Sequence, residues 1–100
     1  MAIRLFLIGF MMSMLAACGA EPLDGAALAQ EKGCVACHGS NGKATVASYP
    51  NLNGQWERYL RLQLRAYRDG PRENAIMNGM ATGLTDEEIN ALAAQYGRES

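Results

Sequence analysis

The sequence predicts an all-α domain, and three observations support this fold class. Residues 55–69 place apolar side chains at helical spacing over about four turns. Residues 85–88, Thr-Asp-Glu-Glu, have the pattern of a helix capping box and precede a second apolar stripe. No segment alternates apolar and polar residues with the period of two that a half-buried strand requires. A chain of 100 residues is long enough for one such domain.

The chain begins with residues typical of an export signal. Arg4 precedes a continuous apolar run that is too short for a spanning helix, which needs roughly 20 apolar residues. The tetrad Leu-Ala-Ala-Cys at 15–18 resembles a bacterial lipobox. We therefore expect a lipoprotein signal peptide over 1–17, a lipid on Cys18, and a short tether over 18–23. The alternative is an ordinary secretory signal in which Cys18 is incidental.

The expected domain, residues 24–100, opens with a helix. Asp24 is a suitable N-cap for a helix over 26–32 that runs into the cysteines. Residues 39–54 are rich in Gly, Ser, Asn and Pro and have no helical period. A loop of this length indicates that a ligand or cofactor orders it.

The helix predicted over 55–69 has two dissimilar faces. Its apolar side chains share one broad arc: Trp56, Tyr59, Leu60, Leu62, Leu64, Ala66 and Tyr67. Gln63 falls within that arc, where it could serve a pocket or a loop carbonyl. Arginines line the opposite side: Arg58, Arg61, Arg65 and Arg68. Two interpretations of this arginine stripe stay open, a solvated helix face and a docking surface for an acidic partner or lipid head groups.

Two shorter elements complete the domain. Residues 74–81 predict a short helical segment that carries Met77 and Met80. The last helix begins at the capping box and ends at Gly97. Its apolar face consists of Ile89, Leu92, Ala93 and Tyr96.

Residues 34–38, Cys-Val-Ala-Cys-His, form the C-x-x-C-H signature of covalent haem attachment. Thiols three residues apart on a helical turn, Cys34 and Cys37, can form thioethers with both vinyl edges of one porphyrin. His38 then reaches the iron from the proximal side. A thiol oxidoreductase would require a βαβ setting, which the sequence lacks. A zinc site would need a fourth ligand, and after the signal peptide the only further His or Cys is Cys18.

The second axial ligand of the iron can be narrowed by elimination. His38 is the only histidine, so two histidine ligands from one chain are impossible. Four of the six methionines lie within the expected signal peptide. Met77 and Met80 remain, and core packing is the alternative role for either of them.

From Asp24 to Tyr96 the chain resembles class I cytochromes c, especially the small bacterial group that includes cytochrome c4 and the c553-type proteins. The matching stretches are Cys-Val-Ala-Cys-His-Gly (34–39), Tyr-Pro-Asn-Leu-Asn-Gly-Gln (49–55), Arg-Tyr-Leu-Arg-Leu-Gln-Leu (58–64), Gly70, Arg72, Ile-Met-Asn-Gly-Met-Ala (76–81) and Leu-Thr-Asp-Glu-Glu-Ile (84–89). The resemblance implies the class I cytochrome c fold, with helices packed around one covalently attached haem c.

The same resemblance implies roles for individual residues. The axial methionine of that group lies eight residues before the Ser or Thr that opens the last helix, which selects Met77. The carbonyl of Pro50 would accept the ring proton of the ligating His38. Ala27 and Tyr96 would meet where the first and last helices cross. The candidate walls of the haem pocket are Leu52, Leu60 and Leu64.

The predicted function is single-electron transfer between redox proteins. Iron held by His38 and Met77 has no open position for a substrate, so we expect a carrier rather than an enzyme and no small-molecule substrate. A thioether ligand and an apolar pocket favour the ferrous state, which predicts a positive reduction potential. One alternative is a cytochrome subunit of a larger oxidoreductase complex. The other is a haem-based sensor or weak peroxidase, if Met77 leaves the iron.

Charge and location follow from the same division of the chain. Without the expected signal peptide the chain has eight basic and ten acidic side chains, a net charge of −2. This balance argues against a nucleic-acid partner. A lipid on Cys18 would anchor the domain to a membrane on the periplasmic, extracytoplasmic side of the cell envelope. Gly19 after that cysteine favours the outer membrane in a Gram-negative cell.

Overall fold

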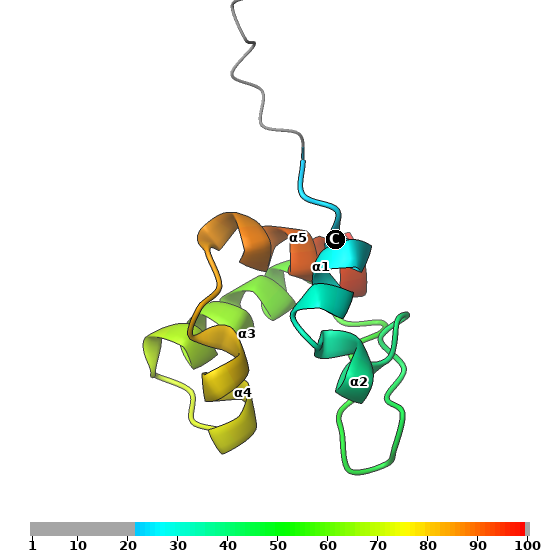
Figure 1. Ribbon diagram of the computed structural model, residues 1–100, viewed down its shortest axis with the longest axis horizontal. Coiled ribbons are helices and arrows are strands. Elements are labelled where there is room, and N and C mark those ends of the chain that lie inside the picture. Colours follow the sequence, from blue (N-terminus) through cyan, green and yellow to red (C-terminus); the bar gives the residue numbers. More distant parts are fainter. Residues whose placement is uncertain (1–21, 100) are drawn as a thin grey trace, which may run out of the picture.

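The computed structural model describes residues 22–99, and these fold as an all-α domain, as predicted (Figure 1). The expected signal peptide, with Cys18, lies outside the described residues. The helices are α1 (Gly25–Glu31), α2 (Cys34–His38), α3 (Glu57–Asp69), α4 (Ala75–Ala81) and α5 (Asp86–Tyr96). Within residues 22–99 no strand forms, and none of the helices is both long and apolar enough to cross a membrane.

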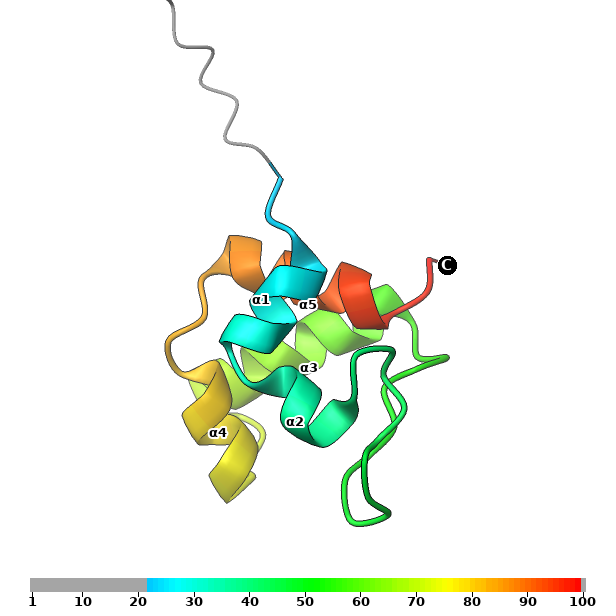
Figure 2. The ribbon, with the colours of Figure 1, turned by 45° about the vertical axis from the view of Figure 1, so that its right-hand side comes forward.

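Helix α1 crosses α5 at one end of the domain (Figures 1 and 2). The crossing is so close at Gly25 that a Cβ atom there would lie 2.6 Å from the Ala91 carbonyl oxygen. Ala29, one turn later, is also buried. The expectation that Ala27 meets the last helix is wrong: Ala27 is exposed, because it lies two residues from each of these contact positions and so on the outer side of α1.

The first two helices are separate rather than one continuous helix. Asp24 caps α1 as predicted, because its carboxylate accepts from the backbone N–H groups of Ala26 and Ala27. The helix then ends at Glu31, and Gly33 turns the chain in the left-handed region at φ +81°. α2 therefore starts in a new direction, with the first cysteine as its first residue.

Helix α3 begins two residues later than predicted, because Trp56 is extended and bridges to the end of the chain. The Glu57 N–H donates to the Arg98 carbonyl, and the Arg98 N–H donates to the Gln55 carbonyl, each at 2.9 Å. Gly97 permits this approach, since a Cβ atom there would lie 2.6 Å from the Glu57 Cα atom. The C-terminal residues thus fasten the start of α3.

The buried face of α3 is narrower than the predicted arc. Leu60 is buried in the core, and Leu64 and Tyr67 pack against it. Other members of the arc are nearly half exposed: Trp56, Tyr59 and Leu62. The remaining core residues come from α1, from the end of α4, from the turn before α5 and from α5 itself: Leu28, Ala29, Ala81, Leu84, Ile89, Leu92, Ala93 and Tyr96.

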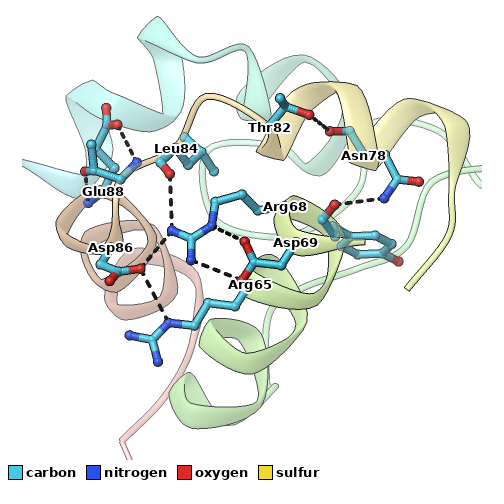
Figure 3. Close-up of polar contacts among 10 residues, drawn as sticks. Arg65, Arg68, Asp69, Asn78, Thr82, Leu84, Asp86 and Glu88 are labelled. Carbon is cyan, nitrogen blue, oxygen red and sulfur yellow. Dashed lines mark hydrogen bonds and ion pairs between the residues drawn. The ribbon is translucent and has the colours of Figure 1, made fainter. Parts of the chain in front are cut away.

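Three of the four arginines of α3 have acidic partners within the chain, namely Arg61, Arg65 and Arg68. Arg61 lies 3.7 Å from Glu57. Arg68 donates to Asp86 at 2.7 Å and to the Leu84 carbonyl at 3.3 Å, and Arg65 Nε lies 3.9 Å from the same Asp86 carboxylate (Figure 3). The predicted arginine stripe is therefore not one uniform positive face, because two of its members join α3 to the start of α5.

Candidate functional site

Helix α2 presents the two cysteines on a single helical turn. Glycines in the left-handed region bound it, with Gly33 before it and Gly39, at φ +75°, after it. Both thiols are half-buried and unpaired. Burial raises the pKa of the Cys34 thiol. A thiol oxidoreductase needs a lowered thiol pKa, so this site does not have the electrostatics of that alternative.

His38, the last residue of α2, is fixed by a backbone carbonyl. Its side chain is 7% exposed, and its Nδ1 atom lies 2.9 Å from the Pro50 carbonyl oxygen, which is the contact that the resemblance implied. A carbonyl oxygen only accepts, so Nδ1 carries the proton in this contact. The other ring nitrogen, Nε2, is therefore left with a lone pair for a metal.

Tyr96 supports the histidine from α5. Its ring meets the His38 ring edge-on, with centroids 6.5 Å apart and planes at 64°. Its hydroxyl donates to the carbonyl of Gly39, the residue after the histidine, at 2.9 Å. Burial raises the pKa of Tyr96 to about 12, so the hydroxyl stays protonated as a donor at neutral pH.

The loop between α2 and α3 is ordered by its own hydrogen bonds. The Gly42 carbonyl accepts from the N–H groups of Leu52 and Asn53, at 2.7 and 3.0 Å. Thr45 donates its hydroxyl to the Ala36 carbonyl at 3.0 Å. These contacts bring the far end of the loop, with Pro50, back over α2.

The helices and this loop enclose a cavity with about 830 Å³ of empty space, including its mouth. Both His38 and Met77 line it, and so do the three predicted wall leucines. The full lining is Cys34, His38, Pro50, Asn51, Leu52, Gln55, Tyr59, Leu60, Gln63, Leu64, Tyr67, Arg72, Met77, Leu92 and Tyr96.

The two candidate methionines of α4 are in different surroundings. Met77 is half-buried and lines the cavity. Met80 is 41% exposed and is not among the lining residues. A half-buried thioether and a buried imidazole on the walls of one largely apolar cavity form a donor set that fits an iron porphyrin.

One polar cluster on the cavity wall was not predicted from the sequence. Arg72 donates to the Gln63 side-chain oxygen at 2.5 Å, and its guanidinium lies 4.7 Å from the centre of the Tyr67 ring. Gln63 lines the cavity, which is the first of the two roles that the sequence left open, and its side-chain oxygen accepts from Arg72. The Gly-Pro pair at 70–71 predicts a turn, and a turn here returns Arg72 to the cavity.

A metal site made only of protein ligands is not present in the described part of the chain. Within residues 22–99, no three His, Cys, Asp or Glu side chains come together in an arrangement that could hold a metal ion. The zinc alternative therefore finds no ligand set among these residues.

Comparisons with known proteins agree with this geometry. The family model described as cytochrome c matches residues 23–94. Cytochrome c-554(548) of Halomonas halodenitrificans is 48% identical over 66% of this chain and 83% of its own length. A thiosulfate dehydrogenase electron acceptor of Thiomonas intermedia is 47% identical over 65% of this chain, but the match spans 30% of that relative.

A solved structure of cytochrome c4 from Acidithiobacillus ferrooxidans has the same fold. It superposes with a TM-score of 0.66 at 30% sequence identity and covers 76% of this chain. The match spans 48% of that structure, so the cytochrome c4 chain is about twice the length of the matched region.

Proposed function

The chain belongs to the cytochrome c family and carries single electrons, and we propose that it does so through one haem c whose iron is held by His38 and Met77. The observation that carries the ligand assignment is that both side chains line one cavity beside Cys34. His38 has its Nδ1 proton committed to Pro50, which supports Nε2 as the iron ligand. Met77 supplies the facing thioether.

When bound, the haem supplies a one-electron iron couple. The residues of the chain hold that group and control its surroundings. Cys34 and Cys37 attach it covalently. The leucines of the cavity wall, Leu52, Leu60 and Leu64, exclude water and lower the local dielectric. If His38 and Met77 both hold the iron, no position would be left for a substrate, and the site would be suited to transfer electrons rather than to catalyse a reaction.

The ligand pair and the burial point to a positive reduction potential. A thioether is a weak donor and stabilises ferric iron poorly compared with a second imidazole. The apolar wall disfavours the additional charge of the ferric state in the same direction. We therefore place this protein as an acceptor of electrons from an oxidative or respiratory donor. A dehydrogenase is a suitable class of donor, since one relative is named as the electron acceptor of thiosulfate dehydrogenase.

We further propose that the protein works at a membrane in the cell envelope. The lipobox at 15–18 supports a lipid on Cys18, on the periplasmic, extracytoplasmic side. Only about six residues would then separate the lipid from the domain, a reach of roughly 20 Å when extended. Gly19 favours the outer membrane. Growth with a labelled fatty acid should label the protein, and Cys18→Ala should remove both the label and the membrane fraction.

The optical spectrum of the domain in both redox states tests the ligand assignment. We expect a c-type reduced spectrum and, in the ferric state, the weak long-wavelength band of a sulfur-ligated haem. Met77→Ala should remove that band, whereas the matched variant Met80→Ala should keep it, because Met80 lies outside the cavity lining. A native spectrum without the band, or one that shifts on addition of carbon monoxide or peroxide, would instead favour the haem sensor or weak peroxidase.

A further inference from the structure

Helix α4, which carries Met77, has little that would hold it in place by itself. It is seven residues long, and an isolated helix of that length is unstable in water. Much of its surface faces solvent, since Ala75, Ile76, Gly79 and Met80 are all exposed. Its last residue, Ala81, is buried in the core, and the helix that it packs against is α3. The position of Met77 therefore depends on the few contacts that connect α4 to its neighbours.

The side chain of Asn78 makes the most direct of these contacts (Figure 3). Its amide nitrogen donates to the Tyr67 carbonyl on α3 at 2.8 Å and to the Arg72 carbonyl at 2.9 Å. Its amide oxygen accepts from the Asn74 N–H at 2.7 Å. One residue thus joins α3, the turn after it and the N-cap of α4.

These hydrogen bonds lead directly to Met77. Asn74 caps α4, and its side-chain oxygen accepts from the Ile76 and Met77 N–H groups at 3.1 and 3.0 Å. The Asn74 backbone is in turn held by Asn78. Asn74 and Asn78 therefore form a reciprocal pair that fixes both the start of α4 and the backbone of the methionine between them.

The orientation of α4 matters because it carries a competing thioether. Met77 and Met80 are three residues apart and share one side of the helix, yet only Met77 lines the cavity. A small rotation or shift of α4 along its axis would withdraw Met77 or exchange its place with that of Met80. The Asn78 contacts oppose both movements, because they connect α4 to two separate backbone points.

We propose that Asn78 is the positioning residue that holds Met77 at the cavity, and this inference rests on the proposed ligation of the iron by Met77. At the other end of α4, Arg68 donates to the Leu84 carbonyl and to Asp86 (Figure 3). That contact fixes the turn after α4. Asn78 fixes the side of α4 that presents the ligand, so its loss acts on the ligand first.

The variant Asn78→Asp tests this role in the haem-loaded protein. It keeps the size of the side chain and the oxygen that accepts from Asn74, but replaces the two donations with a charge facing two carbonyl oxygens. Asn78→Ala removes the amide without adding a charge. The matched control is Thr82→Ala at the C-cap of the same helix, which removes only the hydrogen bond from the Thr82 hydroxyl to the Asn78 carbonyl.

The measurements are the ferric sulfur-to-iron band per haem and the rate at which the ferrous protein binds carbon monoxide. We expect both Asn78 variants to lose most of the band and to bind carbon monoxide about tenfold faster, the factor that corresponds to the loss of one hydrogen bond. Thr82→Ala should match the native protein in both measurements. A change in stability alone would move neither the band nor the rate under native conditions.

Two other results would distinguish a failure of the positioning role of Asn78 from a failure of the proposed ligation by Met77. If Met77→Ala lacks the band while both Asn78 variants keep the native band and rate, the positioning role is wrong and the ligation by Met77 stands. If Met77→Ala keeps the native band, the proposed ligation itself is wrong, whatever the Asn78 variants show.

Discussion

His38 and Met77 line the same cavity, but the parts of the wall that carry them are built in different ways. We call these parts the histidine wall and the methionine wall. The histidine is buried at the end of α2, and its ring is fixed by the Pro50 carbonyl and met edge-on by Tyr96. The methionine is half-buried on a short helix whose outer surface is exposed. Its own side chain has no directional contact that fixes it, and its backbone is placed by Asn74 and Asn78.

This difference indicates which side of the site gives way first. The histidine wall is held through the ligand's own ring, so displacing His38 requires the loss of buried contacts. The methionine wall is held through the backbone of α4, which is largely exposed and has Ala81 as its buried residue, so we expect α4 to open at a lower free-energy cost than the histidine wall. Ligand exchange in this protein should therefore take place on the methionine side.

The largest expected effect comes from removal of the fixed ligand. Loss of the hydrogen-bond partner of a metal ligand typically lowers metal affinity roughly 10- to 100-fold. His38→Ala removes the proposed ligand itself, so the amount of covalently bound haem should fall by more than that factor. Met77→Ala should keep nearly native haem content, since the thioethers and the histidine remain. Haem staining of denaturing gels, normalised to total protein, measures both. Equal losses in the two variants would show that the two walls do not differ.

Tyr96→Phe is expected to have the next largest effect, on the histidine wall. The change removes one oxygen and leaves the Gly39 carbonyl without this donor, which should cost about 1 to 3 kcal/mol of unfolding free energy. The sulfur-to-iron band should persist, because α4 is not touched. Denaturant unfolding of the haem-loaded protein measures the cost. The control is Tyr49→Phe, whose side chain lies outside the cavity lining, and its stability should be close to native.

The same tyrosine predicts the alkaline limit of stability. Burial raises the pKa of Tyr96 from 10 to about 12, so the folded state favours the protonated hydroxyl. That contribution is complete below pH 10 and is lost as the pH rises from 10 to 12. The native protein should lose stability over this range, and Tyr96→Phe should lose less. An equal decline in both proteins would contradict the role of this hydroxyl.

The histidine wall could be predicted from sequence far better than the methionine wall. Local signals define it, because the C-x-x-C-H motif places Cys34, Cys37 and His38 on one helical turn. The contact of His38 with Pro50 and the choice of Met77 over Met80 came from the family resemblance. The structure contains the contact, and it places Met77 but not Met80 in the cavity lining, while the ligation by Met77 stays a prediction.

The contacts that hold α4 could not be predicted in the same way. Asn78 donates to two backbone carbonyls that are six and eleven residues away, and no side-chain pattern marks a carbonyl as an acceptor. The arginines of α3 showed helical spacing, but their partner Asp86 is on another helix and appears only after folding. The prediction that Ala27 meets the last helix was wrong for a similar reason, because the crossing of α1 and α5 places Gly25 and Ala29 at the contact.

The smallest expected effect is at the start of α5, which lies next to the methionine wall. The Thr85 hydroxyl accepts from the Glu88 N–H, and the Glu88 carboxylate accepts from the Thr85 N–H, which completes the predicted capping box. Thr85→Ala should cost about 1 kcal/mol, typical of a lost N-cap. Asp86, the partner of Arg68, is the first residue of this helix. Fraying here should therefore speed carbon monoxide binding slightly and leave the haem content unchanged.

The capping box contains a carboxyl group, that of Glu88, which titrates in the acid range. The backbone N–H of Thr85 holds the pKa of Glu88 below its ordinary value of 4.5, and Lys32 adds to the effect. A lowered carboxyl pKa contributes stability that is complete above pH 4.5 and is lost as the pH falls through the folded value. Glu88→Gln should therefore flatten the acid decline of stability that the native protein shows.

If titration also released Met77 before the domain unfolds, the ferric sulfur-to-iron band would fade at a higher pH than the helical circular dichroism. Coincident loss of the two signals would mean that α5 and the methionine wall open only as part of global unfolding.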